Sequence, residues 1–496
     1  MTSLPEIRSP DRFFIGGRWI KPSSDTKLPV VTPSTEELYL EVAEAAADDV
    51  DLAVAAARRA FDDGPWPRMS PAERAVYLRD IGKAIAARSG MLADMWTSEM
   101  GVLRTIAGSV IPAVGGVWDY YASLAATFEF VERHAGSYTR KVELLVREPV
   151  GVVAAILPWN GPLPCIAWKL APALLAGCTV ILKSAPEGPG SALVMAEIFE
   201  SVGLPPGVVN VLTADRNVSE MLVRHPGVDK VTFTESSAVG KKIGSICAER
   251  VARCTLELGG KSAAVILDDY DLEMAANSLT GAARMLSGQR CAALTRVVVG
   301  RNRQKALLEA MAAIFGALRV GDPFAAETDM GPLAFSRQRD RVEQFIASGL
   351  AEGATLVTGG GRPSHLNRGF YVEPTVFGDV DSSMTVAQQE IFGPVICVIP
   401  ADSDQQAVDI ANDSVFGLNA SVFTNDTRRA YAISRRLRSG TVGHNGDFTD
   451  MKIAFGGFKQ SGIGREGGVE GLRSFLETKV VVLDEGPVDL TASSAT

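Results

Sequence analysis

Short apolar runs alternate with longer helical patterns between Gly151 and Asp268. The expected strands are 152–157, 179–183, 208–212, 228–233 and 255–258, and the expected helices are 164–176, 191–202, 217–225 and 237–249. The strand runs are continuously apolar rather than alternating, which indicates strands that are buried on both faces. Their alternation with helices therefore predicts a parallel sheet that is covered by helices on both sides.

A second alternation of strands and helices follows Leu267. Its expected helices are 273–285, 304–318, 336–352, 404–412 and 428–437, and its expected strand is 296–299. A chain of 496 residues is too long for one ordinary core. We therefore predict a second α/β domain, with the glycine run 359–361 in a loop.

Two further β-type segments fit neither alternation. Residues 137–147 alternate polar and apolar side chains, and residues 479–483 form a short apolar run. Exposed strands of this kind are either edge strands of one subunit or strands that pair with another subunit. The residues alone leave both alternatives open.

Composition limits the possible partners and the compartment. The net charge is −9 without a Lys/Arg run, so we expect no nucleic-acid partner. No apolar stretch approaches the ~20 residues of a membrane span, and residues 1–10 do not resemble a signal or transit peptide. Six cysteines without a CxxC pair indicate a reducing compartment, and we expect a cytoplasmic location. Four scattered histidines predict no metal site.

Two segments carry candidate reactive groups. Cys291 follows Gly288-Gln289-Arg290 at a point where the backbone can turn, although a lone cysteine is usually a small buried apolar residue. Glu257 lies between two leucines at an expected strand end, directly before two glycines. A carboxyl group in such an apolar setting has a raised pKa, as a general base near neutral pH requires.

Asn160 supplies a third candidate, because it follows the first expected strand of the sheet. Open α/β sheets bind ligands at the carboxyl ends of their strands. The asparagine is therefore either a turn residue or an amide donor to a developing oxyanion.

Five ordered motifs place these residues in a known context. They are PWN at 158–160, LELGGK at 256–261, GQRC at 288–291, EIFGPV at 390–395 and FGGFKQSGIGRE at 455–466. With them the chain resembles the aldehyde dehydrogenase superfamily over essentially its whole length. The resemblance implies a cofactor domain at 1–131 and 151–257, a catalytic domain at 258–472, and an oligomerisation arm and tail at 132–150 and 473–496. It also implies a homodimer or homotetramer.

The resemblance also implies the chemistry. Cys291 would attack the aldehyde, Asn160 would stabilise the oxyanion, and Glu257 would activate the water that hydrolyses the thioester. Lys169 joins the implied catalytic set. The product would be a carboxylic acid, and the retention of Glu257 disfavours a coenzyme A-acylating relative.

Cofactor contacts are implied at Ile156, Pro158, Trp159, Lys183, Ala185, Ser236, Val239, Gly259, Glu390 and Phe392. Three features depart from the family pattern. The position of the usual ribose-binding glutamate holds Pro186, Glu235 replaces a glycine, and the turn at 214–219 is poor in glycine. A missing ribose carboxylate favours NADP, whereas Glu235 would repel its extra phosphate. We expect NAD, with NADP possible.

Substrate contacts are expected at Gly161, Cys165, Trp168, Thr449 and Phe455. Gly161 stands where many relatives carry a bulky aromatic residue, so it either widens the channel or merely serves the turn. The wider channel would suit a bulky apolar, terpenoid or aromatic aldehyde.

Two alternatives concern the charge of the substrate and the class of enzyme. No arginine or lysine obviously belongs to the aldehyde channel, which disfavours a charged semialdehyde, although Lys452 could argue otherwise. The departures in the cofactor pattern also allow a thiol-dependent esterase with a degenerate cofactor pocket.

Overall fold

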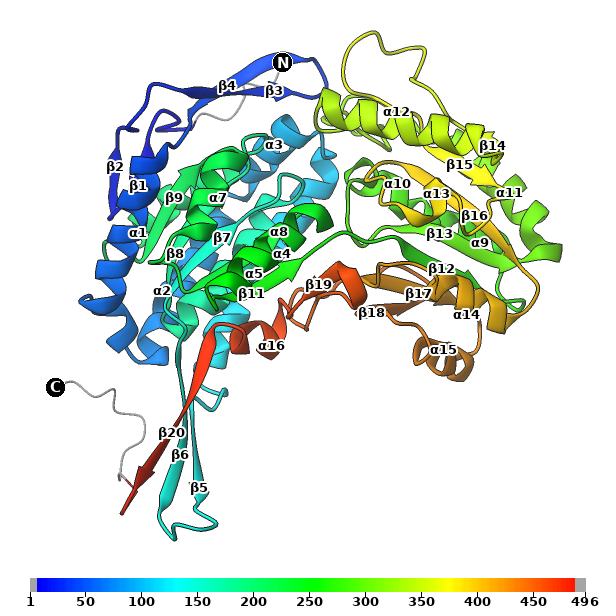
Figure 1. The fold of residues 1–496 in the computed structure, drawn as a ribbon. Coiled ribbons are helices and arrows are strands. Elements are labelled where there is room, and N and C mark those ends of the chain that lie inside the picture. Colours follow the sequence, from blue (N-terminus) through cyan, green and yellow to red (C-terminus); the bar gives the residue numbers. More distant parts are fainter. Residues whose placement is uncertain (1–6, 487–496) are drawn as a thin grey trace.

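The computed structural model describes residues 7–486. The first six residues of the predicted cofactor domain (1–6) and the last ten of the predicted tail (487–496) lie outside the described residues. Figure 1 shows two large sheets, each flanked by helices, and a narrow β arm that extends away from both. No helix within residues 7–486 is long and apolar enough to cross a membrane.

The first large sheet has the strand order β19-β11-β10-β7-β8-β9-β1-β2. Its strands are β1 (Phe13–Ile15), β2 (Arg18–Ile20), β7 (Val152–Ile156), β8 (Thr179–Ser184), β9 (Val209–Thr213), β10 (Lys230–Thr234), β11 (Arg253–Glu257) and β19 (Gly462–Ile463). The five strands from β7 to β11 are parallel, as predicted. Among these five parallel strands, β7 comes first and lies in the middle. The chain then adds β8 and β9 on one side of β7 and crosses over to add β10 and β11 on the other side. That reversal places a ligand-binding crevice at the carboxyl ends of β7 and β10.

Helices cover both faces of this sheet. They are α1 (Ala47–Asp62), the 3-10 helix η1 (Trp66–Arg68), α2 (Pro71–Ala87), α3 (Ser89–Met100), α4 (Arg104–Leu124), α5 (Pro162–Ala176), α6 (Gly190–Ser201), α7 (Arg216–Arg224) and α8 (Ser237–Glu249). Val153 and Ala155 of β7 pack with α2 to α6, whereas Val152, Ala154 and Ile156 pack with α1, α7 and α8. The alternating side chains of one strand thus contribute to two separate cores.

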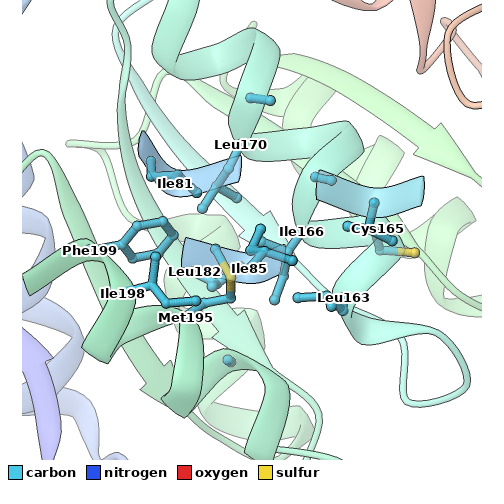
Figure 2. Packing of buried hydrophobic residues seen from close by; sticks show 14 of the residues in the cluster. Ile81, Ile85, Leu163, Cys165, Ile166, Leu170, Leu182, Met195, Ile198 and Phe199 are labelled. Carbon is cyan, nitrogen blue, oxygen red and sulfur yellow. The ribbon is translucent and has the colours of Figure 1, made fainter. Parts of the chain in front are cut away.

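Helix α5 connects the first core to the crevice. Pro162 occupies its first turn, where no backbone N–H is needed, and Gly177 ends it in the left-handed region with φ 100°. Figure 2 shows Leu170 of α5 beside Ile81 of α2 and Ile166 beside Ile85, with Cys165 at the margin of the cluster. Packing of α5 therefore fixes the residues at its amino end, beside the crevice.

The second large sheet has the order β14-β15-β16-β13-β12-β17-β18, and only β14 runs antiparallel. Its strands are β12 (Ser262–Ile266), β13 (Leu294–Gly300), β14 (Thr355–Thr358), β15 (Thr375–Gly378), β16 (Val395–Ala401), β17 (Asn419–Phe423) and β18 (Thr441–His444). Its helices are α9 (Leu272–Leu279), α10 (Gly281–Arg284), the 3-10 helix η2 (Met285–Gly288), α11 (Arg301–Gly316), α12 (Ser336–Ala351), α13 (Thr385–Gln388), α14 (Asp404–Asn412), α15 (Thr427–Ser434), the 3-10 helix η3 (Lys459–Ser461) and α16 (Gly468–Arg473). The predicted second α/β unit is confirmed.

One predicted helix of this unit, 273–285, is interrupted at a single residue. Helix α9 ends at Leu279 and α10 runs from Gly281 to Arg284, and Thr280 between them keeps helical dihedral angles. Leu286 and Ser287 then adopt left-handed φ values of 55° and 52°, which no α-helix accommodates. The break reorients the chain just before Cys291.

The arm consists of β5 (Val131–Ala135), β6 (Val142–Pro149) and β20 (Leu476–Leu483), and a separate hairpin pairs β3 (Lys27–Thr32) with β4 (Glu37–Ala43). The predicted strand 137–147 is wrong at its start, because residues 136–141 form the turn between β5 and β6. Arg140 has a φ of 55°, and the Lys141 N–H donates to the Thr139 hydroxyl over 3.2 Å. The arm strands pair with each other, and the domain boundaries stay a prediction.

The strand ends of the two large sheets face each other. Strand β11 ends at Glu257, and β12 begins at Ser262 after the short segment 258–261. The carboxyl ends of the first sheet therefore face the amino ends of the second sheet. Segments 289–293 and 390–394 precede β13 and β16, so they lie at that same edge. Asn160 follows β7, Glu257 is the last residue of β11, and Cys291 precedes β13, so these three candidate groups lie where the two sheets meet.

Candidate active site

A cavity of about 1300 Å³ lies between the two sheets. The predicted site residues that line it are Pro158, Trp159, Asn160, Gly161, Cys165, Trp168, Ser236, Glu257, Cys291, Glu390, Phe392, Thr449 and Phe455. Six other predicted residues do not line it, namely Ile156, Lys169, Lys183, Ala185, Val239 and Gly259. The structure thus brings together the predicted nucleophile, base and amide donor.

A tight turn presents Cys291 to this cavity. Leu286, Ser287 and Gly288 are three consecutive residues with positive φ, and a Cβ at Gly288 would collide with the backbone of Gly393. The Ser287 hydroxyl donates to the Gly331 carbonyl over 2.8 Å. Such hydrogen bonds hold a conformation that non-glycine residues rarely adopt.

Asn160 contacts the same segment from the first sheet. Its Nδ2 donates to the backbone carbonyl of Gln289 over 2.8 Å, and its own carbonyl accepts from Trp96 Nε1 over 3.0 Å. A side-chain amide carries two N–H donors, so one remains for an oxyanion at Cys291. One hydrogen bond of Asn160 therefore orients the donor that the chemistry needs.

Glu257 is 3% exposed, and neither carboxylate oxygen has a hydrogen-bond partner among residues 7–486. Burial raises its pKa well above the usual value, the Glu466 carboxylate adds to this, and Lys169 and Arg465 oppose it. A Cβ at Gly456 would collide with Glu257 Oε1, so glycine leaves room for the carboxyl group. The raised pKa expected for Glu257 is confirmed.

The Cys291 thiol lies in an equally unfavourable place for charge. Burial raises the pKa of Cys291 to about 12, with further contributions from Glu390 and Glu257, while Arg290 opposes the shift. The thiol is therefore protonated near neutral pH in this form. A nearby base must take its proton before the sulfur can attack.

Lys169 lies behind the cavity wall and forms a buried ion pair with Glu466. Its Nζ also donates to the hydroxyl of Thr234 over 2.7 Å and to that of Thr232 over 3.3 Å. Sequence reasoning missed Glu466, although this residue ends the motif at 455–466. Its partner lies almost 300 residues away in the chain, at |i−j| = 297, so only the fold joins them.

One wall of the cavity suits a dinucleotide. Trp159 packs edge-to-face on Phe335 and Phe392, with ring centroids 4.9 and 5.3 Å apart. Glu390 accepts a hydrogen bond from the Gly260 N–H over 3.0 Å, and burial raises its pKa to about 7. A Cβ at Gly259 would collide with this carboxyl group, so glycine forms the cradle around it.

The adenosine end of that wall carries a charge cluster. Ser236 caps the amino end of α8, where an anionic group is favoured. Lys183, the penultimate residue of β8, lies behind the cavity lining; burial lowers its pKa, while Glu235, Glu187 and Asp215 oppose the shift. With the aromatic cluster and Glu390, these groups fit a nicotinamide dinucleotide.

Apolar side chains form another part of the cavity lining. Trp168 and Phe455 stack with centroids 5.0 Å apart and an interplanar angle of 16°. A Cβ built at Gly161 would meet no atom within 4 Å, so neighbouring side chains do not refill that space. Cys165 reaches the cavity from α5, and burial raises the pKa of its thiol.

The expectation that no arginine belongs to the aldehyde channel is wrong. Arg290 lines the cavity and forms an ion pair with Asp447. The residue occupies the variable position of the GQRC motif, so the motif gave no indication of its role. Residues 447–452 all line the cavity too, which includes the predicted Thr449 and Lys452.

Comparison with known proteins agrees with this geometry. The family model described as "Aldehyde dehydrogenase family" matches residues 19–481. The chain belongs to the aldehyde dehydrogenase family. It is 42% identical to a geranial dehydrogenase from Castellaniella defragrans over 472 residues, which cover 95% of this chain and 98% of that relative. The predicted family, fold class and enzyme class are confirmed.

Solved structures share the same fold. The aldehyde dehydrogenase of Mycobacterium tuberculosis complexed with NAD+ is 46% identical, with a TM-score of 0.94 over 97% of this chain and 99% of that chain. A variant of aldehyde dehydrogenase C from Pseudomonas syringae complexed with NAD+ and octanal is 40% identical. Its TM-score is 0.93 over 98% of this chain and 100% of that chain.

Proposed function

We propose that this aldehyde dehydrogenase oxidises bulky, largely apolar aldehydes, of the terpenoid or aromatic kind, to carboxylic acids with NAD. The observation that carries the proposal is the open space at Gly161, beside the stacked rings of Trp168 and Phe455 and in the same cavity as Cys291. The geranial dehydrogenase and the octanal complex among the similar proteins support an apolar substrate.

Each step of the reaction has a residue in the cavity. Cys291 loses its proton to a base and attacks the aldehyde carbon, and the second N–H of Asn160 stabilises the oxyanion that forms. NAD, when bound, supplies the hydride acceptor that turns the thiohemiacetal into a thioester. Glu257 then takes a proton from water, which hydrolyses the thioester and frees Cys291. Lys169 and Glu466 set the charge behind Glu257.

NAD rather than NADP suits the adenosine end. Three carboxylates, Glu187, Glu235 and Asp215, lie close enough to Lys183 to act on its pKa. Their charge would repel the extra phosphate of NADP. Trp159 lies in the cavity, so a fluorescence titration with both cofactors tests the preference directly. Binding of neither would leave the thiol-dependent esterase as the better description.

An aldehyde panel tests the substrate class. We expect citral and benzaldehyde derivatives to give a higher kcat/KM for NADH production than acetaldehyde. Gly161→Phe should lose the bulky substrates first, because the ring would fill the open space, whereas Gly161→Ala serves as the matched small control. Equal efficiency for all aldehydes in both variants would contradict the assigned channel.

Two variants test the chemistry. Cys291→Ala should abolish both oxidation and ester hydrolysis. Glu257→Gln should keep a rapid burst of about one NADH per site and then stall, because the thioester forms but is not hydrolysed. Unchanged steady-state turnover would refute the role of Glu257.

We further propose a homodimer or homotetramer in the cytoplasm, with the domain boundaries given above. Strand β20 carries Val480 and Val482, which are 61% and 48% exposed on the arm, as a subunit contact would need. Six free cysteines fit a reducing compartment. Light scattering of the intact protein and of Val480→Lys tests the assembly, since a charge at a subunit contact should weaken it.

A further inference from the structure

The guanidinium of Arg290 has donors that the protein does not use. It pairs with Asp447 through Nη2, and its Nε is buried without a hydrogen-bond partner among residues 7–486. The side chain is 21% exposed, and the residue lines the cavity directly before Cys291. An arginine offers five N–H donors, and donors removed from water require acceptors. Nε is shielded from water as well, so the donors that water or a substrate in the cavity can reach are those of Nη1 and the remaining hydrogen of Nη2.

Asp447 cannot turn to satisfy the remaining donors, because other groups hold it. Asn419 Nδ2 donates to Asp447 Oδ1 over 3.0 Å and to the Ala292 carbonyl over 2.9 Å. The same amide thus ties the partner of Arg290 to the residue after Cys291. One edge of the guanidinium is fixed, and the rest of the group stays available to the cavity.

The charge of the pair restricts what can bind there. Asp447 neutralises Arg290, so no anion is needed to balance the guanidinium, and a substrate carboxylate would have to compete with Asp447. An uncharged oxygen can accept from the free donors without displacing anything but water. The stacked rings of Trp168 and Phe455 give the site an apolar face, and Asp450 and Lys452 also line the cavity.

We propose that Arg290 determines specificity by donating a hydrogen bond to an uncharged oxygen, of a keto, ether or hydroxyl group, on an otherwise apolar aldehyde. This inference rests on the proposed function, since it requires aldehyde oxidation at Cys291. It narrows the substrate class from apolar aldehydes to those that also carry such an oxygen.

Matched substrates test the proposal. Each methoxybenzaldehyde is compared with the ethylbenzaldehyde of the same ring position, because the two differ mainly by an oxygen in place of a methylene group. For at least one ring position we expect the methoxy-to-ethyl ratio of kcat/KM to be roughly tenfold higher in the wild type than in Arg290→Met/Asp447→Asn. The double variant removes both charges and keeps the oxygen that accepts from Asn419.

Asp447→Asn alone is the control, because it keeps Arg290 and frees its Nη2. It should retain the methoxy preference or increase it. A ratio that is the same in the wild type and both variants at every ring position would overturn the proposal, while NADH production from all the aldehydes would leave the proposed function intact. No oxidation of any aldehyde by the wild type would instead defeat the proposed function itself.

A measurement on the wild type covers the case in which the variants fail to fold. Matched methoxy- and ethylacetophenones are not oxidised, so their inhibition constants report binding alone. Tighter binding of a methoxy compound by roughly tenfold supports the proposal, and equal constants at all ring positions overturn it.

Discussion

The buried pair of Lys169 and Glu466 acts on Glu257 in opposite directions. Burial is the main cause of the raised pKa of Glu257; next to it, the Glu466 carboxylate raises this pKa and the Lys169 ammonium lowers it. Glu466→Gln removes the repulsion and leaves Lys169 as an unopposed cation. We therefore expect the pKa of Glu257 to fall in Glu466→Gln and to rise in Lys169→Met.

The size of the effect follows from the burial of the pair, whose side chains are 0% and 4% exposed. Two charges about 5 Å apart at an effective dielectric constant near 20 interact by roughly 3 kcal/mol, and relaxation reduces this, so we expect a shift on the order of one pKa unit. Each single variant should also destabilise the fold by about 3–5 kcal/mol, because it leaves a charge buried without its partner.

The assay is the pH dependence of steady-state NADH production between about pH 6 and pH 10. Glu257 works as a base in its ionised form, so the rising limb of kcat follows its pKa. The limb should move to lower pH in Glu466→Gln and to higher pH in Lys169→Met. Lys169→Met/Glu466→Gln is the matched control, since it removes both charges and should recover most of the thermal stability.

Two results would refute this reasoning. A shift of the limb in the same direction in both single variants would show that electrostatics at Glu257 does not control the step. A double variant that is as unstable as the sum of the singles would show that the two residues are not coupled. A stable double variant that stays slow would support the expected catalytic role of Lys169, whereas full recovery of kcat would make it structural.

Three further outcomes follow from the same structure. Glu99 is buried, accepts from the Gly190 N–H over 2.8 Å, and has its pKa raised by burial to about 8. The stability that Glu99 contributes is present below its unfolded pKa and is lost as pH rises through about 8. Across that range the unfolding free energy of Glu99→Gln, followed by thermal denaturation, should therefore gain about 3–5 kcal/mol relative to the wild type. A difference between the two proteins that does not change with pH would argue against the raised pKa. Alkylation of Cys291 by iodoacetamide in the cofactor-free enzyme should accelerate about tenfold per pH unit from pH 7 to pH 10, and a plateau near pH 8 in the mass-spectrometric time course would contradict the raised pKa. Gly456→Ala should slow deacylation and lower the unfolding temperature, because its Cβ would collide with Glu257 Oε1 at a φ of 150°, while Gly161→Ala should leave that temperature unchanged.

Sequence patterns predicted most of the fold that positions the site. Continuous apolar runs identified β7 to β11 with errors of one or two residues, because strands buried on both faces leave a strong signal. The helix expected at 273–285 is interrupted at Thr280 and ends one residue early, but the turn that follows it was not predicted. The left-handed residues Leu286 and Ser287 belong to no common turn pattern, and contacts with distant segments hold them.

The residues of the candidate site also differ in whether local sequence patterns or contacts between distant segments reveal them. Cys291, Glu257 and Asn160 could be found because each lies at a strand end or turn inside a motif. Glu466 and Asp447 could not, because their importance lies in ion pairs with residues that are far away in the chain. A motif shows which residue types recur together, but it does not show which buried charges meet.

Cys291 and Glu257 are buried in the same cavity, so a charge on one group affects when the other can ionise during the reaction. The Glu257 carboxylate raises the pKa of the Cys291 thiol, whereas burial and the Glu466 carboxylate raise the pKa of Glu257. A thiolate formed beside an ionised Glu257 would place a second negative charge in the same buried site, so attack by the sulfur is favoured while Glu257 is protonated. Once the sulfur is acylated, it no longer carries charge, and an ionised Glu257 meets no repulsion from it. We infer that Glu257 then becomes free to act as a base, so that acylation of Cys291 itself prepares the residue that hydrolyses the thioester.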